Sequence, residues 1–220
     1  MVYDVYWGAG SPYSWRVLLG LELKGLKYNS NLLEFSKREH LTPEILALNP
    51  RGQVPILKDG EHAIYESIAI LVYLDRKNPE KPLFGTTPAE TGFIWQRVFE
   101  SENYLSKPLD KIIRPIFFDD VKDNLHSIEK AAAYAHAEFK TMDAWLASSP
   151  YIAGDTISAA DVVVFPVIQA LLRALSLEAA ETLELGLDPF EQTYPNISNW
   201  IARITKLPGY EKTYPPNWKD

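Results

Sequence analysis

The chain has 220 residues, a formal net charge of −7 and no cysteine. The acidic balance argues against nucleic acid and anionic membranes as partners, and the lack of cysteine excludes disulfides, cysteine nucleophiles and thiolate metal sites. No apolar run has the length of a membrane span or a signal peptide, so we expect a cytoplasmic protein with no membrane partner.

The first 78 residues alternate between strand and helix patterns. Residues 2–7 are rich in β-formers and predict a strand. Ser11-Pro12 begins a helix that runs to about Lys24, because serine suits the N-cap and proline the first helical position. Residues 27–34 predict a second strand, and this strand–helix–strand order indicates a βαβ unit with parallel strands. A short helix over residues 42–48 follows.

The most informative stretch is residues 49–67, NPRGQVPILKDGEHAIYES. Two short apolar runs flank an Asp-Gly turn and predict a β-hairpin. Pro55 at the strand entrance removes a backbone donor, and a cis Val54-Pro55 bond is one way to accommodate it. In that geometry the N–H and C=O of Val54 face outward, where they can pair with an extended peptide.

Ser67 ends the hairpin and begins an apolar helix. Backbone N–H groups and the dipole attract anions at a helix N-terminus. A strand-like docking edge therefore lies beside a carboxylate site, and the stretch predicts a receptor for a short acidic peptide.

The rest of the chain has helical periodicity. Residues 79–89 contain three prolines and a glycine and predict a linker. Helices are then expected over residues 90–119, 124–148, 158–175 and 195–206. We expect the first of these to bend near Pro108 or Pro115. Ser158 and Asp161 have the spacing of a capping box, although aspartate reaches less far than glutamate.

Ser11 and Ser14 have the spacing at which thioredoxin-like redox proteins carry Cys-x-x-Cys. Without sulfur the site cannot exchange disulfides, but a hydroxyl at a helix N-terminus can donate a hydrogen bond to a bound thiolate. The helix dipole acts in the same direction, and the pKa of a free thiol, about 8.5, falls in such a setting. Ser11 is therefore a catalytic candidate, with a simple N-cap as the alternative.

The motifs NPRGQVPIL, YESIAIL, SPYSWRV and YIAGDTISAADVVVFP resemble those of cytosolic glutathione transferases of the serine type, the phi-, tau-, theta- and zeta-like branches. The resemblance covers essentially the whole chain. It implies an α/β thioredoxin-like N-terminal domain at residues 1–78, a linker at 79–89 and an all-α C-terminal helical domain at 90–220. The helical domain is expected to contribute the electrophile pocket.

The resemblance also implies roles for single residues. The catalytic serine maps to Ser11, with Ser14, Tyr6 and Tyr13 as rivals for the thiolate. Glu66 is expected to bind the ammonium of the glutamyl end of glutathione. The glutathione-binding candidates are Ser11, His40, Gln53, Val54, Glu66 and Ser67. The candidates for the electrophile pocket are Tyr13, Tyr104, Ile112 and Phe117.

These roles have ordinary structural alternatives. Apolar and aromatic residues at helical spacing are more often core. His40 matches a position that contacts the glycine end of glutathione, and a loop histidine is otherwise solvent-exposed. Leu41 stands where related branches often carry a lysine, which weakens that end of the site.

The function implied is that of a glutathione transferase, which adds the thiolate of glutathione to a hydrophobic electrophile. The alternatives are a glutathione-dependent isomerase or peroxidase, and a non-catalytic glutathione-binding or regulatory protein on the same fold. Glutathione is the co-substrate, and the spacing of the four histidines predicts no metal. Proteins of this kind generally form homodimers.

Overall fold

The computed structural model describes residues 2–219. Within that range the chain divides into two compact units. The first unit contains residues 2–83 together with the C-terminal segment 207–219, and the second contains residues 84–206. None of the helices in the described range is long and apolar enough to cross a membrane.

The first unit is built on one four-stranded sheet. Its strands are β1 (Tyr3–Trp7), β2 (Tyr28–Leu32), β3 (Ile56–Asp59) and β4 (His62–Tyr65), in the spatial order β2-β1-β3-β4. β1 and β2 are parallel, as predicted, whereas β3 is antiparallel to β1 and to β4. Val5 and Leu57 lie opposite each other in β1 and β3, and both are fully buried.

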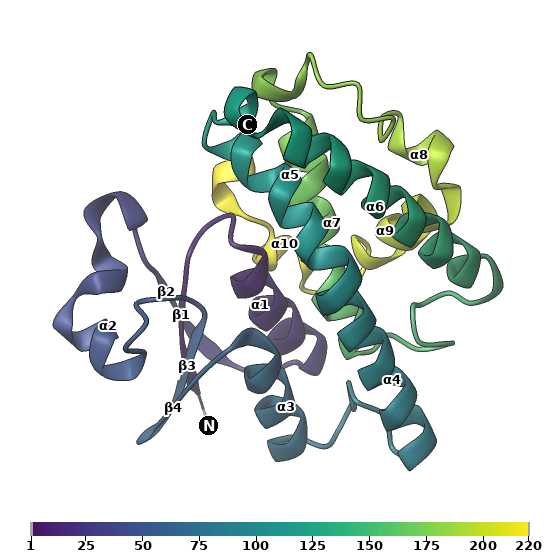
Figure 1. Cartoon of the computed structure of the whole chain (residues 1–220). Coiled ribbons are helices and arrows are strands. Elements are labelled where there is room, and N and C mark those ends of the chain that lie inside the picture. Colours follow the sequence, from purple (N-terminus) through teal and green to yellow (C-terminus); the bar gives the residue numbers. More distant parts are fainter. Residues whose placement is uncertain (1, 220) are drawn as a thin grey trace. The chain divides into compact units, whose positions relative to one another are not determined.

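Three helices cover this sheet, α1 (Pro12–Lys24), α2 (Pro43–Leu48) and α3 (Ser67–Lys77). Figure 1 shows α2 on one side of the strands and α1 and α3 on the other. The core beneath α1 and α3 is apolar and includes Val17, Leu18, Leu21, Ile70 and Leu74. The order of elements and the mixed sheet confirm the predicted thioredoxin-like arrangement.

β2 is shorter than the predicted strand 27–34. After Leu33 donates its N–H to the Trp7 carbonyl, the next N–H, that of Glu34, bonds to the Glu39 carboxylate at 2.8 Å. A side chain thus replaces the strand partner, and the chain turns into two short 3₁₀ helices, Phe35–Lys37 and Glu39–Leu41.

The first unit extends beyond residue 78 because a buried ion pair holds the next segment. The Lys24 ammonium lies 2.8 Å from Asp75 and also donates to the carbonyls of Glu80 and Lys81. Asp75 accepts the N–H of Leu83 at 2.7 Å. The first half of the predicted linker is therefore bonded to α1 and α3.

The C-terminal segment also belongs to the first unit, whereas the resemblance places all of 90–220 in the helical domain. It contains α10 (Tyr210–Thr213) and a 3₁₀ helix, Pro216–Trp218. Aromatic side chains of this segment pack around Trp15 of α1. This packing holds residues 207–219 in the first unit.

The second unit is all-helical. It contains α4 (Pro88–Glu100), α5 (Lys107–Phe117), α6 (Val121–Ser148), α7 (Ala159–Leu175), α8 (Phe190–Thr193) and α9 (Pro195–Ile204). The expected helix 90–119 is interrupted by a π-helical segment, Ser101–Ser106. This irregularity ends just before Pro108, whose ring crowds the carbonyl four residues earlier. Pro115 lies inside α5.

The predicted capping box of α7 is present. The Asp161 carboxylate accepts the Ser158 N–H at 2.9 Å, and the Ser158 hydroxyl caps the first turn. The shorter acid therefore reaches its partner. Asp161 also accepts the N–H of Ile152 at 2.9 Å and the indole N–H of Trp200 on α9 at 2.8 Å.

Candidate active site

Ser11 lies at the junction between β1 and α1. Its extended backbone (φ −75°, ψ 116°) makes it the N-cap, and its hydroxyl oxygen accepts the Ser14 N–H at 3.2 Å. The residue is half-buried. No residue between 2 and 219 accepts a hydrogen bond from the Ser11 hydroxyl. This O–H can therefore donate to a bound group at the positive end of the α1 dipole.

The rival side chains are placed differently. Ser14 is fully buried, and its oxygen accepts the Gly8 N–H at 3.3 Å. Tyr6 lies within β1, paired with Ile56 of β3. Tyr13 is exposed, and the guanidinium of Arg16 lies 4.9 Å from the centre of its ring. Among these hydroxyls only that of Ser11 combines partial exposure with the N-cap position.

A second helix N-terminus lies at Ser67, the first residue of α3. Glu66 precedes it as the N-cap with φ +70°, a conformation that non-glycine residues rarely adopt. Such strain is found where the surrounding structure imposes it, often at ligand sites. The buried guanidinium of Arg16 donates to the Ser67 hydroxyl at 3.4 Å, which links the first turns of α1 and α3.

The segment before β3 contains Gln53 and Val54. The Val54-Pro55 peptide bond is cis, as the sequence suggests. Asn49 is buried, and its amide donates to the Gln53 carbonyl at 2.8 Å while its side-chain oxygen accepts the Arg51 N–H at 3.1 Å. Across residues 2–219 neither backbone group of Val54 has a partner, so both remain available to a peptide.

His40 lies beside this segment in the 3₁₀ helix Glu39–Leu41. A Cβ added at Gly52 would lie 3.2 Å from the His40 carbonyl, so the two chain segments are in close contact. The His40 ring meets the Phe35 ring edge-on at 4.7 Å. Its Nδ1 atom is buried and has no hydrogen-bond partner among residues 2–219, which leaves this nitrogen available to a polar group.

Phe35 is a site neighbour that the sequence argument did not identify. A Cβ built on Gly8 would lie 2.5 Å from the end of the Phe35 ring, so the ring packs directly on the loop before Ser11. Phe35 is nevertheless 45% exposed. One feature of the sequence could have identified Phe35. This aromatic residue lies just before the charged run Lys37–Glu39, and an exposed apolar side chain in a charged segment often marks a binding site.

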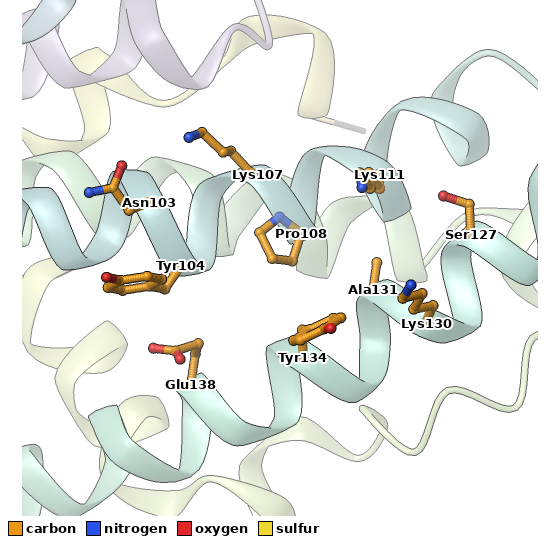
Figure 2. Close-up of a pocket in the computed structure, with 10 residues that line it drawn as sticks. All are labelled: Asn103, Tyr104, Lys107, Pro108, Lys111, Ser127, Lys130, Ala131, Tyr134 and Glu138. Carbon is orange, nitrogen blue, oxygen red and sulfur yellow. The ribbon is translucent and has the colours of Figure 1, made fainter.

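The electrophile-pocket candidates in the helical unit do not form one cluster. Tyr104 is 57% exposed and lines a groove of about 340 Å³ between the segment Asn103–Lys111 and α6. Figure 2 shows Tyr104 and Tyr134 along this groove, with Pro108 between them. Ile112 is fully buried on α5, whereas Phe117 is exposed at the end of that helix. Of these three candidates, only Tyr104 lines the groove.

Three lysines, Lys107, Lys111 and Lys130, and the acid Glu138 border the same groove. Lys111 and Lys130 lie toward one end and Glu138 toward the other (Figure 2). Burial raises the pKa of the Glu138 carboxyl, and the nearby Glu100 adds to this rise. No group of three or more His, Asp or Glu residues that could hold a metal ion occurs in the described part of the chain.

Comparison with known proteins decides the family. The model of the glutathione S-transferase N-terminal domain matches residues 10–77, and that of the C-terminal domain matches residues 126–203. Glutathione S-transferase A of Pleuronectes platessa is 33% identical over 96% of this chain and 91% of its own length. The chain belongs to the glutathione S-transferase family.

Solved structures agree with this assignment. A glutathione S-transferase from the Antarctic clam Laternula elliptica has a TM-score of 0.85 and 32% identity, covering 100% of this chain and 95% of its own. A glutathione S-transferase-I solved with bound lactoylglutathione has a TM-score of 0.79 and 25% identity, covering 96% and 97% of the two chains. Both units of this family member therefore have counterparts in solved structures.

Proposed function

We propose that this glutathione S-transferase binds glutathione along residues 49–67 and ionises its thiol at Ser11. The observation that carries the proposal is the half-buried Ser11 hydroxyl, whose hydrogen has no acceptor within residues 2–219 and which caps the positive end of α1. A relative of similar fold was solved with lactoylglutathione, a glutathione thioester, which supports the same class of ligand.

The proposed binding contacts use backbone groups and side chains between His40 and Ser67. The backbone N–H and C=O of Val54 pair with the central cysteinyl residue of glutathione. The N-terminus of α3 and the Ser67 hydroxyl hold the glutamyl carboxylate, and Glu66 holds the ammonium of the same end. Gln53 supplies a further side-chain contact there. The buried Nδ1 of His40 makes this residue a contact for the glycine end.

The chemistry follows from charge at the sulfur. The Ser11 O–H donates to the thiolate, and the α1 dipole stabilises the same negative charge. The thiol proton leaves to solvent, and the sulfur lone pair forms a C–S bond to the electrophilic carbon. The electron pair displaced from that carbon leaves with a halide or moves into a conjugated group. Tyr13, Tyr104 and Phe117, which are exposed, remain proposed residues of the electrophile pocket, whereas Ile112 is fully buried and could only support it from beneath.

Ser11→Ala tests this mechanism. With 1-chloro-2,4-dinitrobenzene as acceptor, we expect kcat to fall by about 10²-fold, because one fixed donor to the reacting charge is lost. The dissociation constant of glutathione, measured by calorimetry, should change only a few-fold, since the main-chain contacts remain. Ser14→Ala is the matched control and should retain most of the activity, because its hydroxyl is buried.

Two outcomes would contradict the proposal. If Ser11→Ala keeps wild-type kcat and an unchanged thiol pKa of bound glutathione, another group ionises the sulfur. If the wild-type protein binds glutathione but conjugates no acceptor, the protein is a binding module.

We further propose that the protein acts in the cytoplasm as a homodimer, which light scattering would detect as twice the chain mass.

A further inference from the structure

The end of the C-terminal segment lies against the loop that precedes Ser11. A Cβ built on Gly10 would lie 3.2 Å from the amide nitrogen of Asn217 and 3.3 Å from the indole nitrogen of Trp218. Gly10 has φ +77° and is bonded directly to Ser11. Two N–H-bearing groups from the far end of the chain therefore face the residue next to the proposed catalytic serine.

Aromatic packing fixes this end of the tail on α1. The Trp15 ring meets the rings of Tyr214 at 5.8 Å and Trp218 at 5.6 Å, both edge-on. Its indole N–H also donates to the Thr213 hydroxyl at 2.8 Å. Trp15 lies one helical turn beyond Ser11, so the tail and the catalytic loop share one rigid support. Figure 1 shows α10 beside α1.

The nitrogen donors at this point remain unused. Neither the Trp218 indole N–H nor the Asn217 side-chain amide has a hydrogen-bond acceptor among residues 2–219. Asn217 is exposed, whereas the body of Trp218 is buried and thereby held in place. A fixed donor beside a reacting centre stabilises negative charge that develops there, and its effect is largest in the transition state.

We propose that Trp218 and Asn217 donate hydrogen bonds to an oxygen atom of the electrophile, such as the carbonyl oxygen of an α,β-unsaturated ketone, and that these two residues determine specificity for acceptors that carry such an oxygen. This inference rests on the function proposed above. The thiolate attacks the β-carbon and forms the C–S bond. The C=C electron pair shifts to give an enolate, whose charge lies largely on the oxygen that faces the two donors. A solvent proton then adds to the α-carbon, so no leaving group is needed.

Two acceptors separate this role from a structural one. An α,β-unsaturated ketone carries the oxygen, whereas benzyl chloride has no oxygen and reacts at the same thiolate. Trp218→Phe keeps a ring in the aromatic cluster and removes the N–H, and Asn217→Ala changes an exposed side chain. Lys212→Ala is the matched tail control, because its ammonium pairs with Glu22 at 3.2 Å, away from Gly10.

We expect each donor variant to lose about tenfold in kcat/KM with the unsaturated ketone. With benzyl chloride the loss should be less than about twofold, because this acceptor has no oxygen atom that the two donors could bond. The glutathione KM and the thiol pKa of bound glutathione should stay unchanged. Lys212→Ala should behave as wild type with both acceptors.

Two results would overturn the inference and leave the proposed function intact. In one, kcat/KM falls equally with both acceptors; in the other, neither variant loses kcat/KM with the ketone. Ser11→Ala, run in parallel, should lose activity with both acceptors. If Ser11→Ala retains both activities, or wild type conjugates neither acceptor, the proposed function fails and this inference fails with it.

Discussion

Asp161 is fully buried in the helical unit, and its carboxylate accepts hydrogen bonds from three backbone or indole N–H groups and from the Ser158 hydroxyl. The residue therefore joins the loop before α7, the start of α7 and Trp200 of α9. Each buried donor left without an acceptor costs about 1–3 kcal/mol.

Removing this carboxylate should destabilise the protein strongly. We expect Asp161→Ala to lower the free energy of unfolding by at least about 3 kcal/mol, because several buried donors lose their acceptor together. Urea denaturation followed by circular dichroism measures the change. Asp155→Ala is the control, because Asp155 is an exposed acid in the loop before α7. A loss at Asp161 no larger than that at Asp155 would contradict the argument.

The ion pair between Asp59 and Lys77 predicts a dependence of stability on pH. The hydrogen bond from the Lys77 ammonium, followed by that from the Tyr73 hydroxyl, lowers the pKa of the Asp59 carboxyl below its ordinary value of 3.8. Because the folded pKa lies below the unfolded one, the pair stabilises the fold above the unfolded pKa. The stabilisation disappears as pH falls through the folded pKa.

Lys77→Met should therefore be less stable than wild type at pH 7. The gap should begin to narrow near about pH 4 and should close only at lower pH, as Asp59 becomes protonated in folded wild type as well. Urea midpoints measured from pH 7 to about pH 2.5 test this, within the range where both proteins remain folded. A gap that stays constant over the whole range would show that the lost stability comes from packing and not from charge.

At the residue scale, the sequence predicted positions that depend on local chemistry. Ser11 as an N-cap and Ser67 at a helix start follow from short motifs, whereas the cis bond before Pro55 was one of the options that the sequence left open. Phe35 and Asn217 were missed because their contacts with Gly8 and Gly10 join segments distant in sequence. The roles proposed for the site residues remain predictions.

At the scale of elements, the close approach of α1 and α3 depends on the absence of a side chain at Gly20. A Cβ there would lie 2.4 Å from the buried Leu71 Cδ2 atom, whereas a Cβ at Gly92 of α4 meets nothing within 4 Å. Alanine is favoured over glycine in a helix by about 1 kcal/mol, and this gain applies to both positions. Overpacking offsets it only at Gly20, at a cost of about 1–3 kcal/mol.

The same substitution should therefore have opposite effects at the two positions. Gly92→Ala should raise the thermal midpoint, and Gly20→Ala should lower it, as measured by calorimetry on the two variants and wild type. Equal stabilisation by both substitutions would show that Leu71 rotates away without cost and that the helix packing is looser than the structure indicates.

Most elements were predictable because their signals are local. Periodicity and caps predicted the longer helices to within a few residues, and the Asp59-Gly60 turn predicted the hairpin, whereas the short helix α8 was not predicted. The π-helical segment was not predicted: a proline indicates where a helix is disturbed, but the widened turn depends on how Ser101–Ser106 packs. The tail elements were missed because short amphipathic signals do not reveal which surface they cover.

At the scale of the whole molecule, the N-terminal part of the described chain and its C-terminal segment belong to one unit. Deleting residues 207–220 should uncover Trp15, which is 2% exposed, and remove its Thr213 partner. We expect α1 amides to exchange hydrogen at least about tenfold faster, because their local opening costs less. Amides of α7, which belongs to the other unit, should keep their protection. Faster exchange confined to α7 would contradict this assignment of the tail.

The return of the tail to α1 also bears on how the protein is made. A ribosome finishes residue 83 on the order of ten seconds before it reaches the aromatic residues that cover Trp15, given synthesis at about 5–20 residues per second. During that interval the nascent first unit carries an uncovered Trp15 indole, and the loop before Ser11 lacks its contacts with Asn217 and Trp218. The first unit can therefore complete its packing only after residues 207–219 have been synthesised.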